Sequence, residues 1–128
     1  MIIEEVSFFH IDYFRFSHDK VVEYFKTNQF DVVGISAVVS TAYEYTKYLT
    51  GIIKGTRKET VIFLGGGLAA SAEILHRKAN VDFCVLGDGE IISQNLVKAI
   101  KENKTGDSDL EKIKGISFID SNDKFKFT

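Results

Sequence analysis

The sequence has no proline and only one cysteine. Average usage of about 5% would give a chain of 128 residues about six prolines. Proline is the usual marker of linkers and helix ends, so here the boundaries of elements have to come from periodicity and glycine. The single cysteine, Cys84, excludes an internal disulfide and fits a reducing cytoplasm. One cysteine also cannot hold an iron–sulfur cluster or a structural zinc ion by itself.

The sequence also has no large excess of charge of one sign and no long apolar run. The net charge is −2 and the pI is about 5.9, so no basic field attracts nucleic acid or an anionic membrane. No apolar run approaches the roughly 20 residues that span a bilayer, and no signal-peptide pattern is visible. Apolar residues make up 45% of the chain and charged residues 27%. These values are typical of one globular domain, which we expect to be cytoplasmic.

Apolar periodicity predicts an alternation of strands and helices. Ser17 is a candidate N-cap for the first predicted helix, and Gly55 a candidate C-cap for the second. The tail "KGISFIDSNDKFKFT" predicts a β-hairpin that turns around Ser121–Asp123. The sequence favours strands at 4–10, 31–36, 60–64 and 81–87, and helices at 18–29, 41–54, 69–78 and 90–102.

Strands separated by helices of this length predict βαβ units and a parallel sheet with helices on both faces. The predicted fold is therefore an α/β domain of the flavodoxin-like or Rossmann-like type, with a C-terminal hairpin. Such sheets bind ligands beyond the carboxyl ends of their strands. The segments at that edge are 36–41, 65–70 and 87–90, together with the residues that follow His10.

Three consecutive glycines end the apolar strand in "TVIFLGGGLAAS". A tight strand-to-helix turn explains one or two glycines, whereas three are better explained by a flat ligand close to the backbone. The spacing from Gly65 to Ala70 also fits the dinucleotide motif G-x-G-x-x-G/A, with Asp88 as the acidic partner. Because that motif normally follows the first strand of its fold, NAD binding is only an alternative.

Two further motifs lie at the same predicted edge. In "SAVVST", Ser36 ends a strand and directs its hydroxyl into the crevice. Ser40 and Thr41 either cap the next helix or belong to the site. In "LGDGE", two glycines bracket Asp88, and Glu90 enters the next helix, where an acidic side chain suits the helix dipole.

Catalytic motifs are not found. The chain has no Ser/His/Asp arrangement, no H-E-x-x-H, no P-loop and no paired carboxylates with an evident task. We expect His76 at the surface, Cys84 buried in its strand, and His10 and His18 in surface or capping positions. By its own residues the chain is a binding module without catalytic residues.

Taken as a set, "DVVGISAVVST", "VIFLGGGLAAS", "VDFCVLGDGE" and "IKGISFI" resemble a known family. They are similar to the cobalamin-binding domain that precedes the barrel of cobalamin-dependent radical S-adenosylmethionine enzymes. More distantly, they resemble the cobalamin domains of methionine synthase and the cobalamin mutases. The resemblance implies that the glycines leave room for the flat dimethylbenzimidazole tail of cobalamin.

The resemblance also implies a role for each motif. Ser36 would hydrogen-bond the nitrogen of the tail, Gly65 and Gly66 would give the tail room, and amides around 67–69 would serve the phosphate. The loop at 87–90 would border the nucleotide. The cofactor-binding residues implied in this way are Ser36, Ala37, Val38, Ser40, Thr41, Gly65, Gly66, Gly67, Leu68, Ala69, Gly87, Asp88, Gly89 and Glu90.

Two departures from the family pattern shape these expectations. The motif Asp-x-His-x-x-Gly is missing, which implies cobalamin bound without a histidine ligand and no metal ligand from the chain. The family's first strand and helix also have no counterpart. We therefore expect a cobalamin-binding-like domain at 1–112 and a hairpin or linker at 113–128. The linker would lead to an absent radical S-adenosylmethionine barrel in the same polypeptide.

That barrel would hold the [4Fe–4S] cluster and S-adenosylmethionine, and it would carry out methyl transfer or related radical chemistry. Two other functions remain open at this point. One is a flavodoxin-like interaction or signalling domain without a cofactor, and the other is a dinucleotide-binding domain. Ser36 separates the cobalamin and NAD alternatives, because only cobalamin gives its hydroxyl a role.

Overall fold

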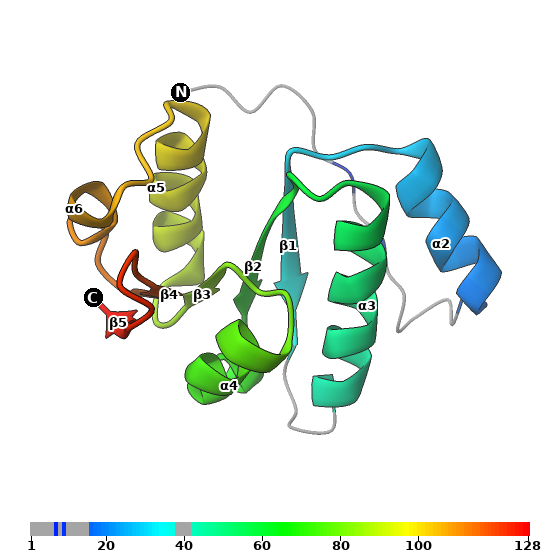
Figure 1. Ribbon diagram of the computed structural model, residues 1–128, viewed down its shortest axis with the longest axis horizontal. Coiled ribbons are helices and arrows are strands. Elements are labelled where there is room, and N and C mark those ends of the chain that lie inside the picture. Colours follow the sequence, from blue (N-terminus) through cyan, green and yellow to red (C-terminus); the bar gives the residue numbers. More distant parts are fainter. Residues whose placement is uncertain (1–6, 8, 10–15, 38–41) are drawn as a thin grey trace.

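A computed structural model describes residues 7, 9, 16–37 and 42–128, apart from the side chain of Leu68. Helices and strands alternate along the described chain, as the periodicity predicts (Figure 1). The elements are α2 (His18–Thr27), β1 (Val32–Ser36), α3 (Tyr43–Thr56), β2 (Val61–Gly65), the 3-10 helix η2 (Gly67–Ser71), α4 (Ala72–Lys78), β3 (Phe83–Val85), α5 (Gly89–Lys101), α6 (Asp107–Leu110), β4 (Ile116–Ile119) and β5 (Phe125–Phe127).

The five strands form one sheet in the order β1-β2-β3-β4-β5. The pairs β1/β2 and β2/β3 are parallel, whereas β3/β4 and β4/β5 are antiparallel. The predicted flavodoxin-like α/β fold is confirmed, but only its first three strands are mutually parallel. The predicted hairpin is also confirmed, and Asp123 occupies its turn with φ of 61°. In the sheet, β4 is an inner strand and β5 the edge.

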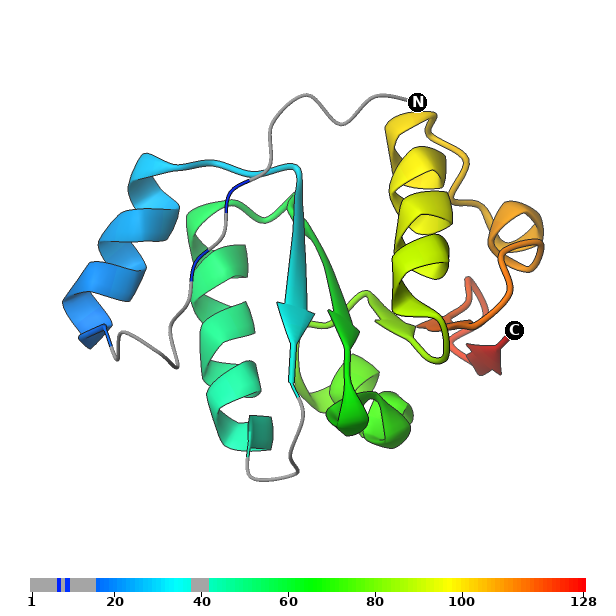
Figure 2. The same cartoon turned by 180° about the vertical axis from the view of Figure 1, so that it is seen from behind.

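The two faces of the sheet are covered differently. Ile62 and Leu64 of β2 point toward α3 and α4 and are fully buried. On the opposite face, Phe83 and Val85 of β3 pack against Leu96 of α5. Figure 2 shows α5 beside β3 and β4, and no described helix crosses β1 or β2 on that side. This face of β1 and β2 is therefore left uncovered by the described helices.

Some local predictions were wrong. Helix α3 continues to Thr56 rather than ending before Gly55, because the Arg57 N–H still donates to the Ile53 carbonyl at 3.0 Å. The buried stripe of α3 runs through Thr46, Leu49, Thr50 and Ile53, whereas Tyr45 is 42% exposed. The predicted cap at Ser17 is confirmed, because its hydroxyl accepts the Lys20 N–H at 3.4 Å. The strand predicted at 4–10 lies almost entirely outside the described residues.

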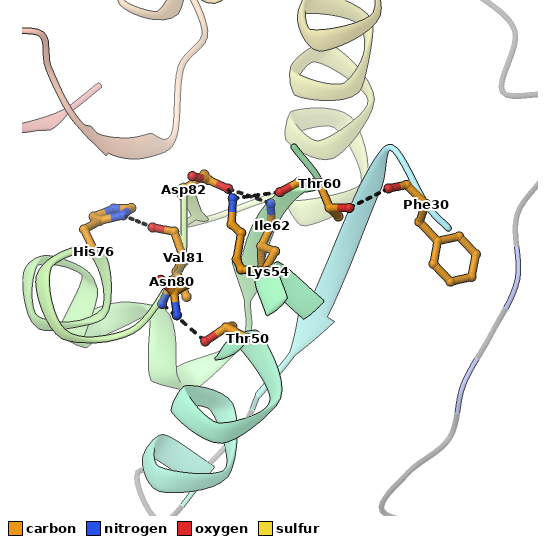
Figure 3. Close-up of polar contacts among 9 residues, drawn as sticks. All are labelled: Phe30, Thr50, Lys54, Thr60, Ile62, His76, Asn80, Val81 and Asp82. Carbon is orange, nitrogen blue, oxygen red and sulfur yellow. Dashed lines mark hydrogen bonds and ion pairs between the residues drawn. The ribbon is translucent and has the colours of Figure 1, made fainter. Parts of the chain in front are cut away.

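A polar network fixes the amino-terminal ends of β2 and β3 (Figure 3). The Asp82 carboxylate accepts the Ile62 N–H and the Lys54 ammonium, both at 2.8 Å. The same Lys54 donates to the Thr60 carbonyl at 2.7 Å, and the Asp82 N–H donates to the Ile62 carbonyl at 2.9 Å. The register of the two strands is thus set at the end of the sheet opposite the motif loops.

His76 is not the surface residue that the sequence predicts. Its Nδ1–H donates to the Val81 carbonyl and its Nε2 accepts the Ser117 hydroxyl, each at 2.8 Å. Burial lowers the pKa of His76. The buried position predicted for Cys84 is confirmed, and burial raises the pKa of its thiol to about 11. His76 therefore ties α4 to the strands, through a partner that lies 41 residues away.

Candidate functional site

The three motif loops meet at the carboxyl edge of the parallel strands. Ser36 and Gly65 are register partners at the ends of β1 and β2, and the Ala37 N–H donates to the Gly65 carbonyl at 3.0 Å. The third loop follows β3, the next strand along. Val38, Ser40 and Thr41 lie outside the described residues.

Ser36 and Gly65 also share one face of the sheet. Side chains alternate between faces along a strand, so Ser36 lies on the same face as Gly34, and Gly65 on the same face as Phe63. Gly34 is itself the register partner of Phe63. This is the face on which no described helix covers β1 and β2 (Figure 2). We call the four residues Gly34, Ser36, Phe63 and Gly65 the open face.

Gly65 and Gly66 have different surroundings. A Cβ built on Gly65 would have no described heavy atom within 4 Å. A Cβ on Gly66 would lie 2.6 Å from the Ala37 carbonyl oxygen, and the φ of Gly66 is 96°. Gly66 is thus needed for the close approach of two backbone segments and for a left-handed conformation. Only Gly65 leaves free space above the strand.

The loop after β3 is open to solvent. Gly87 has a φ of 110°, which favours glycine, and the Leu86 N–H is held by the Gly115 carbonyl at 2.8 Å. Asp88 precedes α5 without capping it through its side chain. Glu90 lies in the first turn of α5, where its charge suits the helix dipole. The loop is held by its backbone and leaves the side chains of Asp88 and Glu90 exposed.

Neither histidine of the described chain is placed with the open face. Both ring nitrogens of His76 are engaged by Val81 and Ser117. His18 begins α2, is exposed, and its Nδ1 contacts the hydroxyl of Tyr48. Within residues 16–37 and 42–128, no group of three or more histidine, cysteine or carboxylate side chains could hold a metal ion. No helix of the described part is long and apolar enough to cross a bilayer.

Two hollows lie away from the open face. One of about 470 Å³ is at the amino-terminal ends of the strands and is bordered by Lys54, Lys58 and Arg77. The other, of about 450 Å³, lies between α4 and β5 and is bordered by Ile74 and Phe127. The open face contributes no residue to either hollow. Its case as a binding site rests on the placement of Ser36 and Gly65 rather than on a closed cavity.

An α/β sheet with glycine-rich loops at the carboxyl ends of its parallel strands is the architecture of a cofactor-binding domain. Residues 5–97 match the family described as the B12 binding domain, and the chain therefore belongs to that family. B12 is cobalamin, so the resemblance seen in the sequence motifs is confirmed. A cofactor-free interaction domain and a dinucleotide-binding domain are not favoured.

Among solved structures, the chain is similar to the radical S-adenosylmethionine methyltransferase TsrM from Kitasatospora setae, with bound tryptophan substrate and an S-adenosylmethionine analogue. The TM-score is 0.72 at 18% sequence identity, over 88% of this chain and 22% of the TsrM chain. This likeness shows a shared fold. The chain spans less than a quarter of the length of TsrM. No curated protein matches the sequence.

One feature of the open face was missed by sequence reasoning. An ideal Cβ on Gly34 would lie 2.7 Å from Cζ of Phe63, so the end of the Phe63 ring rests directly on β1. The sequence shows Gly34 only as an interruption of an apolar strand. The signal that could have found it is the general rule that glycine inside a strand marks close approach by another group.

Proposed function

We propose that the dimethylbenzimidazole tail of cobalamin lies over Gly65, on the open face. The observation that carries the proposal is the pairing of Ser36 and Gly65. They are neighbours in register, they share a face, and the space above Gly65 is free of described atoms. The exposed hydroxyl of Ser36 would donate a hydrogen bond to the tail nitrogen. A flat base needs just such a strand position without a side chain.

Other residues of the edge have supporting roles in the proposal. Gly87, Asp88, Gly89 and Glu90 border the nucleotide, and Gly66 with Ala37 shapes the turn beside it. The Ala69 N–H already donates to the Gly66 carbonyl at 3.1 Å, which leaves the amides of Gly67 and Leu68 to face the phosphate. Val38, Ser40 and Thr41 belong to the proposed site through the sequence motif.

Cobalt would receive no histidine ligand from the described residues, and His10, which lies outside them, does not stand in the family's histidine motif. The support is that His76 uses both ring nitrogens within the fold, and that Asp-x-His-x-x-Gly is missing from the sequence. His18 lies in the contact between α2 and α3. The bound form that we propose is therefore histidine-off cobalamin.

We further propose that the domain serves a radical S-adenosylmethionine enzyme that transfers methyl groups or carries out related radical chemistry. Cobalamin, when bound, supplies a cobalt centre that can carry a methyl group. Residues 1–112 would present it, and 113–128 would lead toward a barrel domain in the same polypeptide. That barrel would hold the [4Fe–4S] cluster and S-adenosylmethionine. A cytoplasmic location, supported by the lone cysteine, completes the proposal.

Titration of the chain with hydroxocobalamin, followed by gel filtration, tests the binding proposal. We expect coloured cofactor to co-elute with protein and to lack the spectrum of histidine-ligated cobalt. Ser36→Ala should weaken binding about 10-fold, because one hydrogen bond to the tail is lost. Ser108→Ala, a serine exposed on α6, is the matched control and should leave affinity unchanged. A colourless protein peak would contradict the proposal and favour a cofactor-free interaction domain.

A further inference from the structure

Phe63 and Gly34 form the inner part of the open face. Gly34 is exposed, and the ring of Phe63, which is only half-buried, ends above it. The three nearest atoms to an ideal Cβ at Gly34 are all ring atoms of Phe63, at 2.7, 3.1 and 3.1 Å. Any side chain at position 34 would push this ring away from β1. The absence of a side chain at Gly34 thus lets the ring of Phe63 lie close to the backbone of the neighbouring strand β1.

The ring lies next to the position proposed for the tail. Phe63 precedes Gly65 by two residues on the same face, which corresponds to about 6–7 Å along the strand. Its other side packs against the cluster of Phe83, Val85 and Leu96 under α5. The ring is therefore supported from below and from one side, while part of it remains accessible. A flat base above Gly65 would meet this accessible part.

We propose that Phe63 is the aromatic contact for the base of the cobalamin tail, and that Gly34 positions its ring. The inference rests on the proposed function, which it extends from the motif residues to two residues that no motif includes. Aromatic rings pair favourably in offset or edge-to-face arrangements, and base–aromatic stacking contributes measurably to affinity. Phe63 would thus select corrinoids that carry an aromatic base.

The test compares cobalamin with cobinamide, which has the same corrin ring but lacks the nucleotide tail. Affinities of hydroxocobalamin and diaquocobinamide would be measured by equilibrium dialysis against the 128-residue chain. We expect Phe63→Leu to weaken cobalamin binding about 5- to 20-fold and to leave cobinamide binding unchanged. Gly34→Ala should act in the same direction, because its Cβ displaces the ring. Phe127→Leu, a phenylalanine 58% exposed on β5, is the matched control and should change neither affinity.

The other possible outcomes would overturn either this inference or the proposed function. Equal losses for cobalamin and cobinamide in Phe63→Leu would indicate a purely structural role and overturn the inference. Unchanged cobalamin affinity in a folded Phe63→Leu variant would overturn it as well. If the wild-type chain binds both corrinoids equally, the tail is not held, and the inference fails although the family function stands. If the wild-type chain binds neither, the proposed function itself fails.

Discussion

Gly65 offers the sharpest test, because stability and affinity should move in opposite directions. In Gly65→Val, the new Cβ meets no described atom within 4 Å, and the φ of Gly65 lies outside the left-handed region. Glycine costs a strand about 0.5–1 kcal/mol relative to residues with a Cβ, and valine is favoured in strands. We therefore expect the free energy of unfolding to rise by about 0.5–1 kcal/mol. This corresponds to a rise in Tm of roughly 2–5 °C.

Binding should fall because the valine side chain occupies the space proposed for the base. Forcing extra carbon atoms into a filled site costs about 1–3 kcal/mol. Losing the hydrogen bond from Ser36 to the displaced base adds about 0.5–1.5 kcal/mol. A combined loss of about 1.5–4.5 kcal/mol corresponds to a drop in affinity of roughly 10- to 2,000-fold. Urea unfolding and equilibrium dialysis with hydroxocobalamin measure the two quantities separately.

Two other glycines provide the controls. Gly51 lies within α3 with no described atom near its Cβ position, so Gly51→Ala should raise stability and leave affinity unchanged. Gly66→Ala should lower stability, since its Cβ would lie 2.6 Å from the Ala37 carbonyl oxygen and its φ is 96°. A Gly65→Val chain that binds cobalamin as tightly as the wild type would refute the proposed position of the tail over Gly65.

Two further predictions concern the fold. Burial lowers the pKa of His76, so the neutral ring is favoured in the folded state. The free energy of unfolding should be at its full value above about pH 6.5 and should decline as the pH falls below it. His76→Gln should flatten this decline in urea titrations at different pH, and an unchanged slope would contradict the argument. Asp82→Ala should cost about 1–3 kcal/mol, because the buried N–H of Ile62 loses its acceptor. The control Glu111→Ala, at an exposed position, should change the free energy of unfolding measured with urea by less than about 0.5 kcal/mol. If Asp82→Ala changed this free energy no more than Glu111→Ala does, the proposed role of Asp82 would be contradicted.

Short-range signals predicted the part of the fold that lies close to the motifs. An apolar run followed by a small polar residue or glycine marks the end of β1 and of β2, and both strands end within one residue of the predicted position. The alternation with amphipathic helices then requires parallel pairing, which places Ser36 beside Gly65. These predictions succeed because each depends on residues that are near one another in the chain.

Features that depend on distant residues could not be predicted in this way. His76 reads as a surface residue because Arg77 and Lys78 follow it, yet Ser117 of β4 buries and hydrogen-bonds it. The three glycines look equivalent in sequence. In the structure, Gly66 allows the backbone of Ala37 to approach closely, whereas Gly65 leaves free space above the strand. That distinction depends on how β1 approaches the turn after β2. Periodicity contains no information on such an approach.

The C-terminal hairpin shows that the folding unit extends beyond the part matched by the family. The match covers residues 5–97, whereas Ile116 and Phe118 of β4 are at most 2% exposed and belong to the core under α5. Ser117, on the same strand, provides the buried partner of His76. The proposed boundary near residue 112 therefore concerns roles along the chain and does not mark the end of the core. The fold itself needs β4, because without it the apolar side of α5 and the polar tie to α4 would lose their partners.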